Sequence, residues 1–493
     1  MPTLIDNILT KCQELLTEFV RRTPALNIDE LSPQGISELT GGILTAVIEA
    51  GRHGLERHIQ SFDAASCEGL LAAGTHVRRA TGERSFLTLL GPVKLDRSLL
   101  YAKGGRGPAS VPLDEAWGMS DRYETPDVAE AVLFAAVELT PADTCEFLEK
   151  FANFKPSREH IHRVINSEGA RLREHVEQPA NRGRLHTQQG AGPGGAEVFV
   201  AGADGVNLAV REPGKKQGRP NRRPGAGTTP DGQKKSSFKN AMVGSFSTYK
   251  SVPVAGDQGG VPGLAPQRLG STYTAKMPEE RFPAFKAEFE QVLEVVEGTL
   301  PEGIRKLFIC DGGRNLWKWA RETAQLESYE WLLDFYHMGE HLARAAEAIF
   351  GADKDAADRW YARWCHKLKH EDGAVGKLLR SMRAYAGRAG RSKARAAELV
   401  KQRVYFERYG DFMGYAAYVR EGLPIATGPL EAACKMLVKQ RLCRAGMRWS
   451  SEGGANVLNL RVLKKSNMWH TAWKSYYQQE ILGGAEQSCK LAA

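Results

Sequence analysis

The pattern of apolar positions predicts a helical start to the chain. Apolar residues recur at helical spacing over residues 5–20 and 43–58, which predicts two amphipathic helices within an N-terminal region of residues 1–84. Residues 85–100 carry a denser apolar pattern that is typical of strands, and Gly91-Pro92 interrupts it. We therefore expect the chain to change from helical to extended structure near residue 85.

Three helical segments are predicted next, between residues 125 and 176. Each begins at a proline or at a Ser or Thr that can cap a helix, namely Pro126, Thr140-Pro141 and Pro156-Ser157. Two short helices before a longer basic one are typical of a helix-turn-helix module, and Arg158 and Arg163 are its candidate DNA contacts. A plain three-helix packing unit fits the same pattern. We group these helices with the preceding strands in a region of residues 85–187.

The period of the pattern changes after residues 188–195, whose sequence QQGAGPGG is typical of a linker. Short apolar runs then predict strands at residues 197–201, 207–210 and 242–249. The pattern then predicts a strand, a helix and a second strand, at residues 306–310, 316–326 and 331–333. Their spacing is that of a parallel strand pair with a crossover helix. Residues 196–337 are therefore predicted to form an α/β domain.

The pattern is helical and basic from residue 338 to residue 422. The motif Thr427-Gly428-Pro429 then predicts the start of one more helix, which carries Glu431. We expect residues 338–423 to form a helical insertion and residues 424–480 to complete the α/β domain. The overall prediction is an α+β multidomain protein.

Charge and cysteine content suggest a partner and a compartment. Among 493 residues, Lys and Arg number 67 and Asp and Glu number 58, so the net charge is +9, which suits a polyanion. No apolar run reaches the roughly 20 residues that a membrane helix needs, and we read no signal peptide at the start. The eight cysteines form no C-x-x-C pair, as expected of free thiols in a reducing cytoplasm.

The residues between 211 and 239 are rich in Lys, Arg, Gly and Pro and cannot form a core. We expect a mobile basic loop that either is solvated or lies along DNA phosphates. Its candidate DNA contacts are Lys215, Lys216, Arg222 and Arg223.

Three acids are candidates for metal-dependent chemistry. Asp204 follows the first predicted strand of the α/β region, Asp311 ends a central one, and Glu431 lies on a late helix. Hard divalent cations prefer oxygen ligands, so three carboxylates can hold Mg²⁺. Each acid also has a structural explanation: Asp-Gly pairs form turns, and the first turn of a helix favours Glu. Spacing alone leaves both interpretations open.

Several segments resemble the Kra-type insertion-sequence transposases of bacteria, which are relatives of the Mutator-like transposases. They are VFVAGADGVNLAVREPGKKQGRP around Asp204, KLFICDGGRNLW around Asp311, WLLDFYHMGEHL after residue 330, and TGPLEAACKMLVKQRLCRAGMRWSSEGGANVLNLR around Glu431. LGPVKLDRSLLY and VPLDEAWGM, nearer the N-terminus, are also similar. The likeness covers most of the chain beyond residue 80 and keeps the order of the family.

The resemblance implies a ribonuclease-H-like catalytic domain, interrupted by the helical insertion, with a DDE active site. Asp204, Asp311 and Glu431 would be the three acids, and two Mg²⁺ or Mn²⁺ ions would bind between them. The family motif of Asp or Cys, two residues and His corresponds to Asp334 through His337, and His337 would contact DNA or hold the site in shape. Transposition requires double-stranded DNA at two ends, so a homodimer or larger assembly is expected, in the bacterial cytoplasm on the nucleoid.

Cations follow the third acid, at Lys435, Lys439, Arg441, Arg444 and Arg448. They suit phosphates at a DNA-cutting site, although a helix also favours cations towards its C-terminus. The insertion carries further cations that fit either DNA or a solvated helix face, at Arg391, Lys393, Arg395, Lys401 and Arg403.

Three other functions compete with transposition. A ribonuclease-H-like nuclease that cuts structured DNA would use the same residues. A domesticated or inactive transposase would only bind DNA. A glycosidase would use two of the carboxylates, but it would want an aromatic-lined sugar cleft in place of these basic tracts.

Overall fold

The computed structural model describes residues 4–22, 32–105, 107–152, 154–189, 195–211, 238–254, 263–387 and 392–482. The chain divides into two compact units. The first consists of Met1–Leu172 and His470–Ala493, and the second of Arg173–Trp469. Both units contain helices and strands, so the chain is an α+β protein, as predicted.

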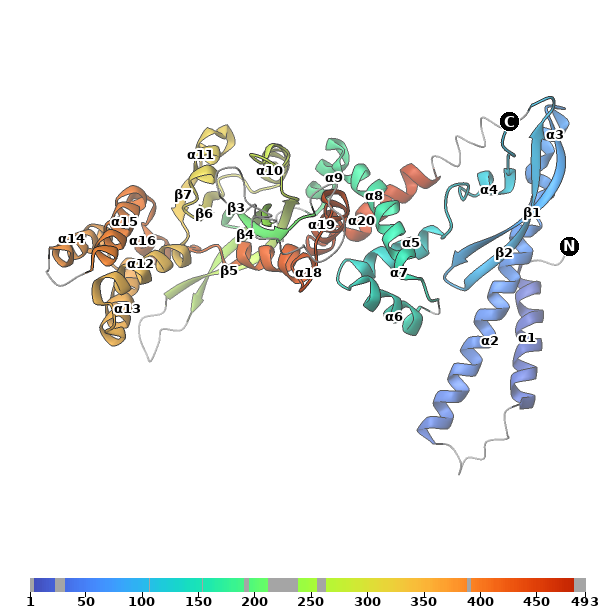
Figure 1. The fold of residues 1–493 in the computed structure, drawn as a ribbon, viewed down its shortest axis with the longest axis horizontal. Coiled ribbons are helices and arrows are strands. Elements are labelled where there is room, and N and C mark those ends of the chain that lie inside the picture. The colour runs from blue at the N-terminus through green and yellow to red at the C-terminus, as the bar shows by residue number, and fades with distance from the viewer. Residues whose placement is uncertain are drawn as a thin grey trace, which may run out of the picture. The chain divides into compact units, whose positions relative to one another are not determined.

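The first unit opens with helices and a β-hairpin, at the right of Figure 1. The helices are α1 (Leu4–Arg22), α2 (Pro33–Gln60) and α3 (Asp63–Ala72). The strands are β1 (His76–Thr88) and β2 (Gly91–Ala102), which pair antiparallel. The stretch predicted at residues 85–100 is thus the inner part of a hairpin, and Gly91, with a φ of +98°, begins its return strand. The expected boundary at residue 85 lies inside β1.

Helices continue the first unit as α4 (Pro112–Ala116), α5 (Pro126–Ala136), α6 (Pro141–Phe151) and α7 (Arg158–Asn166), and α20 (Trp469–Tyr476) joins from the far end of the chain. The division between the units falls inside α8 (Glu168–Glu177), after Leu172. The Thr140 and Ser157 side chains cap α6 and α7 as predicted, accepting hydrogen bonds from Asp143 and His160 amides. The expected long third helix is broken between Asn166 and Glu168.

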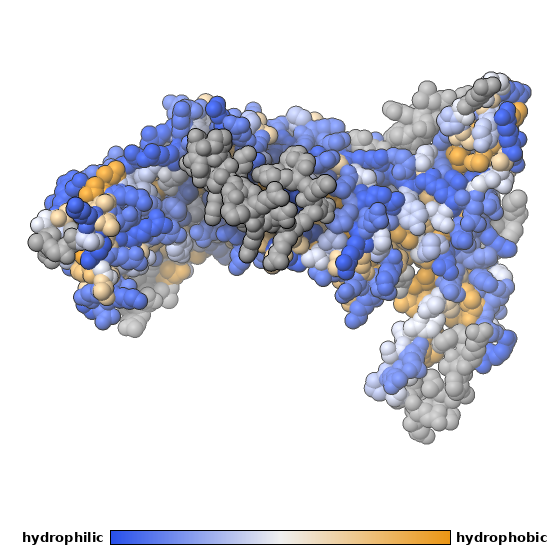
Figure 2. All heavy atoms as spheres, viewed as in Figure 1, coloured by the Kyte–Doolittle hydropathy of each residue, from blue (hydrophilic) through white to orange (hydrophobic). Residues whose placement is uncertain are grey.

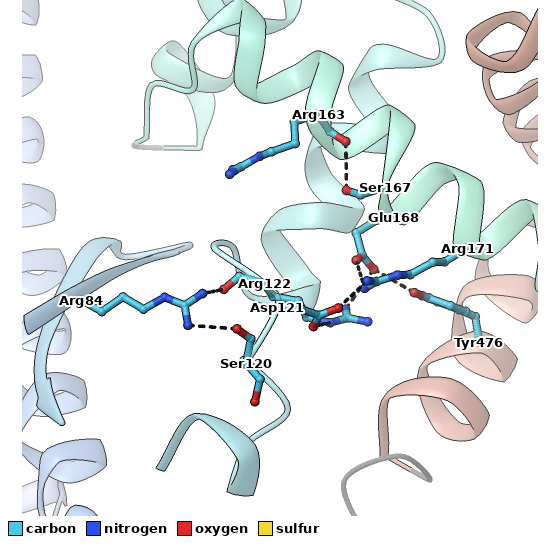
Figure 3. Close-up of polar contacts among 9 residues, drawn as sticks. All are labelled: Arg84, Ser120, Asp121, Arg122, Arg163, Ser167, Glu168, Arg171 and Tyr476. Atoms are coloured by element: carbon cyan, nitrogen blue, oxygen red, sulfur yellow. Dashed lines mark hydrogen bonds and ion pairs between the residues drawn. The ribbon is translucent and has the colours of Figure 1, made fainter. Parts of the chain in front are cut away.

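A buried carboxylate organises the polar contacts of this unit, shown in Figure 3. The Glu168 side chain accepts hydrogen bonds from Arg122, Arg171 and Tyr476, at 2.9, 2.8 and 2.8 Å. Arg84 donates to the carbonyl of Arg122 at 2.6 Å and so ties the hairpin to the same cluster. Because Glu168 is 2% exposed, these donors replace the water that its charge would otherwise need.

The second unit is built on a five-stranded mixed sheet, in the order β5-β4-β3-β6-β7. The strands are β3 (Val198–Ala209), β4 (Phe238–Val254), β5 (Gly263–Lys276), β6 (Arg305–Cys310) and β7 (Glu330–Leu333). The first three pair antiparallel, while β6 pairs parallel with both β3 and β7. The predicted parallel pair with its crossover helix, α11 (Arg314–Glu322), is confirmed.

Two predictions about this sheet need correction. The runs at residues 197–201 and 207–210 form one continuous strand, β3, because Asp204 and Gly205 stay extended and pair with Val243 and Met242. Asp204 therefore lies within a strand and starts no hairpin. Strand β5 and the helices α9 (Pro179–Gln189) and α10 (Pro283–Glu297) were not predicted from the sequence. The expected linker lies partly outside the described residues, since α9 extends to Gln189.

The residues after β7 are almost entirely helical, as predicted. The helices are α12 (Phe335–Phe350), α13 (Lys354–His370), α14 (Ala374–Ala386), α15 (Lys393–Tyr409) and α16 (Tyr415–Arg420). One hydrophobic core continues from the sheet into these helices, from Phe308 and Phe289 to Trp360, Leu378 and Phe406. The insertion is thus anchored to the α/β domain through apolar packing.

The chain returns to the sheet through α17 (Gly428–Ala433), a π-helical turn (Cys434–Lys439), α18 (Gln440–Leu442) and α19 (Ser451–Lys465). Helix α17 packs against β3 and β4, and α19 packs against β5. Residues from His470 onwards group with the first unit, inside the region of residues 424–480 that was expected to complete the α/β domain.

Candidate active site

Asp204 lies where strand β3 extends beyond its parallel neighbour. Strand β6 pairs with β3 only over Val198–Ala201, so the next residues of β3 lack a strand on that side. Gly202 sits at the point of separation, and a Cβ there would lie 2.5 Å from the carbonyl oxygen of Ile309. Glycine therefore permits the close approach of β3 to β6 that places Asp204 beside the end of β6.

The Asp204 carboxylate is partly buried and accepts two hydrogen bonds. The Gly205 amide donates to its Oδ1 at 2.6 Å, and the Cys434 thiol donates to its Oδ2 at 3.5 Å. Burial and the nearby charge of Asp311 raise the pKa of Asp204. A carboxylate near a second negative charge gains from a bound cation.

Asp311 begins the loop between β6 and α11, as predicted for the end of a central strand. Its Oδ1 accepts a hydrogen bond from the Gly313 amide at 3.1 Å. Two aromatic side chains fix the loop: Trp317 donates to the Asp311 carbonyl at 2.6 Å, and Tyr409 donates to the Gly312 carbonyl at 2.8 Å. Tyr409 comes from α15, so the insertion helps to hold the second acid in place.

Glu431 lies in the first turn of α17 and is exposed. The N-cap of this helix is Thr427, the first residue of the motif that predicted its start. Burial, with the charges of Asp334 and Asp204, raises the pKa of Glu431. A cleft of about 800 Å³ is lined by both Glu431 and Asp204.

The segment after Glu431 is held by two buried arginines. Arg461, which is fully buried on α19, donates to the Leu437 carbonyl at 2.8 Å, within the π-helical turn. Arg441 is 1% exposed and lies 5.0 Å from the ring centroid of Trp449. The idea that Arg441 belongs to a surface row of cations is therefore wrong, because its charge is buried against aromatic and sulfur groups.

Asp334 positions the helix that carries the third acid. It is 3% exposed and caps α12, where its Oδ1 accepts from the Tyr336 amide at 3.3 Å. It also accepts from the Thr427 amide at 3.0 Å and the Thr427 hydroxyl at 2.8 Å. One carboxylate thus joins the starts of α12 and α17. An Asp between an apolar strand and a helix is a capping signal in the sequence, but its bond to Thr427 spans 93 residues.

His337 lies in the first turn of α12, close enough to Asp204 for their charges to interact. Its ring is 5.6 Å from that of His341, centroid to centroid, and its charge would lower the pKa of Asp204. His341 is fixed by a 2.6 Å contact from its Nδ1 to Gln402 and by stacking on Tyr405. His337 therefore acts on the site through its charge and forms no hydrogen bond with the acids that the structure describes.

Cys434 was not predicted from the sequence to be part of the site. It follows Glu431 by three residues, a spacing that places two side chains on one face of a helix. Burial and the charge of Asp204 raise the pKa of the Cys434 thiol, so it remains protonated and acts as a hydrogen-bond donor. The three-residue spacing from Glu431 was the feature of the sequence that could have indicated Cys434 as a neighbour of the acids.

The three acids meet around Asp204 without forming a closed cluster. Asp204 lines the cleft of Glu431 and also a second cleft, lined by Asp311. Within the described ranges, no group of three or more His, Cys, Asp or Glu side chains is arranged to hold a metal ion. The oxygen donors suit Mg²⁺ chemically. Binding would have to draw Glu431 and Asp311 towards Asp204.

The predicted DNA contacts fall into different environments. Lys435 and Lys439 line the cleft of Glu431 and Asp204. Arg444 and Arg448 are exposed between α18 and α19 and line none of the described clefts near the acids. Arg395 is engaged by the carbonyls of Ala348 and Ile349, at the end of α12. Five of the candidate cations lie outside the described residues: Lys215, Lys216, Arg222 and Arg223, and Arg391 of the insertion.

In the first unit, Arg158 is the first residue of α7, and Arg163 lies later in the same helix. Arg158 is exposed. Arg163 forms an ion pair with Glu124 at 3.1 Å and lies 5.2 Å from the ring centroid of Tyr123. A DNA phosphate would therefore have to share the Arg163 guanidinium with Glu124.

None of the helices that the structure describes combines the length and the apolar character needed to cross a membrane. A search against models of protein families finds no match to this chain, and a comparison with curated proteins finds no relative.

Proposed function

We propose that this chain is a metal-dependent DNA transposase that cuts and joins strands at the ends of an insertion sequence. The observation that carries the proposal is the meeting of three acids at Asp204. Asp204 shares one cleft with Glu431 and another with Asp311, although these residues are more than 100 positions apart. They come from the middle of β3, the end of β6 and the start of α17.

The fold and the charges support the proposal. A mixed sheet with three antiparallel strands and two parallel ones is compatible with a ribonuclease-H-like domain. A helical insertion separates the second acid from the third, as the resemblance implies. Lys435 and Lys439 adjoin Glu431 in its cleft, where they would bind the phosphates on either side of the cut.

Asp204, Asp311 and Glu431 would hold two Mg²⁺ or Mn²⁺ ions. Metal ions bound there would activate an attacking oxygen and stabilise the leaving one. The chain itself orients the acids: Cys434 donates to Asp204, the Gly313 amide donates to Asp311, and Asp334 fixes the start of the helix of Glu431. His337 borders the site and would tune its charge.

The expected partner is double-stranded DNA carrying terminal inverted repeats, together with target DNA. Helices α5, α6 and α7, which carry Arg158, would recognise the repeats. Two DNA ends must be joined in one complex, so we propose a homodimer or larger assembly on the bacterial nucleoid.

The test is nicking of a supercoiled plasmid that carries the DNA ends flanking this gene. We expect Mg²⁺ or Mn²⁺ to support cleavage at those ends by the wild type, with loss in Asp311→Asn. Asp358→Asn is a matched control, because Asp358 is an exposed acid on α13 and lines none of the described clefts. Equal nicking by wild type and Asp311→Asn would overturn the proposal.

A second candidate is a protein that binds the ends without cutting them. The observation in its favour is that the described acids are not arranged as a metal cluster. Binding of the ends by wild type and Asp311→Asn alike, with no nicking in either metal, would support this candidate. Metal-dependent nicking of branched DNA, without cutting or joining at the ends, would instead indicate a structure-specific nuclease.

A further inference from the structure

A second cleft beside Asp204 is lined by four cations, Arg281, Lys286, Arg314 and Lys318, as well as by three acids, Asp204, Asp311 and Glu322. Its volume is about 810 Å³, and it shares Asp204 and no other lining residue with the cleft of Glu431. The two clefts therefore extend from Asp204 along different elements. The first runs over α17 and the π-helical turn, and the second over β3, β4, the start of α10 and the whole length of α11.

Cations without acidic partners line this second cleft. Arg281, Lys286 and Arg314 have no carboxylate within ion-pair distance in the described part of the chain, whereas Lys318 lies 3.9 Å from Glu322. Lys286 is half-buried. Removing a charged amine from water without a counter-charge is unfavourable, so Lys286 favours a bound anion. Arg281 and Arg314 are exposed, so they add positive charge that such an anion can reach.

The backbone adds to this preference. Helix α11 begins at Arg314 after Gly313, which has no side chain that could cap it. The free amides of a helix N-terminus bind phosphate groups, and Arg314 and Asn315 in this first turn both line the cleft.

Two residues that line this cleft also have an unfavourable backbone conformation. Only three non-glycine residues among those described have a positive φ, and two of them, Arg281 at +59° and Phe282 at +56°, line this cleft. Such backbone strain is concentrated at functional sites. Here it places a cation, Arg281, next to a half-buried aromatic ring, Phe282, in the lining of the cleft.

We infer that this cleft binds an unpaired DNA strand. Cations for the phosphates together with an aromatic side chain for the bases are the combination that single-stranded nucleic acid recognises. The strand would run from Lys435 and Lys439, past Asp204, to Arg281 and Arg314. This inference deepens the proposed function and rests on it for the identity of the nucleic acid.

The test is fluorescence anisotropy with a labelled single-stranded oligonucleotide of mixed sequence, in EDTA, so that binding is separated from cleavage. The full chain is compared with the double variant Arg281→Ala/Arg314→Ala. The matched control is Arg359→Ala/Arg380→Ala, which removes two exposed arginines of the insertion that line neither cleft.

We expect the cleft variant to bind the oligonucleotide at least tenfold more weakly than the control variant. The slope of log affinity against log salt should fall by about 1.4, because each phosphate contact to a single strand contributes about 0.7. The double variant Arg281→Lys/Arg314→Lys should keep that slope, which shows that charge in the cleft, and not folding, is responsible.

Equal affinities of the cleft and control variants would overturn the inference. It would also fall if a deoxynucleoside monophosphate bound the cleft and the oligonucleotide did not. Failure of the proposed function is distinguishable: a chain that never nicks DNA, yet loses oligonucleotide affinity in the cleft variant, keeps the inference. A chain that nicks DNA and whose cleft and control variants bind the oligonucleotide equally loses only the inference.

Discussion

Replacing Asp334 by Ala tests whether one buried carboxylate holds the third acid in place. The change removes the cap of α12 and both hydrogen bonds from Thr427. Loss of a cap costs about 1 kcal/mol, and each bond to a buried charged acceptor costs about 1.5 kcal/mol or more. We therefore expect a loss of about 4 kcal/mol, at the upper end of what single substitutions cause.

The matched control is Asp353→Ala. Asp353 caps α13 through one bond, from the Ala356 amide at 3.0 Å, and it is exposed. Removing this single exposed cap should cost about 1 kcal/mol. The difference between the two variants isolates the contribution of the buried link to Thr427.

Thermal unfolding followed by tryptophan fluorescence measures the effect. Trp317, Trp319 and Trp331 pack in the core beside the candidate site and report on its unfolding. For a unit of this size 1 kcal/mol corresponds to about 2–4 °C, so Tm should fall by about 10 °C in Asp334→Ala and about 3 °C in Asp353→Ala.

Two further variants sharpen the result. Asp334→Asn keeps one acceptor oxygen for the amides of Tyr336 and Thr427 but replaces the oxygen that accepts from the Thr427 hydroxyl, so it should lose about half as much. Thr427→Val combined with Asp334→Ala should cost less than the two single losses together, since both remove the same bond. Equal Tm values for Asp334→Ala and Asp353→Ala would refute the role assigned to Asp334.

Three other predictions follow from the same site. Asp204→Asn should abolish nicking and raise Tm in metal-free buffer near neutral pH. The pKa of Asp204 is raised from 3.8 in the folded chain, so folding favours the protonated carboxyl. The Tm gain of the Asn variant should therefore be full above the raised pKa and vanish below about 3.8. An equal Tm gain at pH 3 and pH 7 would contradict this prediction. Gly202→Ala should lower Tm because its Cβ would meet the Ile309 carbonyl, whereas Gly376→Ala on α14, with no atom closer than 3.8 Å, should raise stability by about 0.5–1 kcal/mol; similar effects of both would argue against the close approach. Iodoacetamide at pH 8 should alkylate exposed Cys443 well before buried Cys434, as mass spectrometry of digested protein would show; equal rates would mean that the thiol of Cys434 is not held against Asp204.

Helices and strands whose signals lie among neighbouring residues could be predicted from the sequence alone. The apolar runs of β6 and β7, with the helix between them, predicted their parallel pairing, because residues close in sequence set that unit. The Thr140 and Ser157 caps and the helical insertion were likewise readable from neighbouring residues. The three acids were proposed from the resemblance, since spacing alone left them ambiguous.

Tertiary structure decided what depends on contacts between distant segments. Only the pairing of β3 with β4 keeps Asp204 and Gly205 extended, against the turn that an Asp-Gly pair favours locally. Arg441 and Arg395 read as surface cations, but folding buries one against Trp449 and binds the other to carbonyls of α12. Asp334 reaches Thr427 across 93 residues, and Arg281, in a left-handed conformation, lines the same cleft as Asp204. Patterns of hydrophobicity and helix capping report on a residue's neighbours in sequence, whereas a site assembled from three distant elements is fixed by how those elements pack.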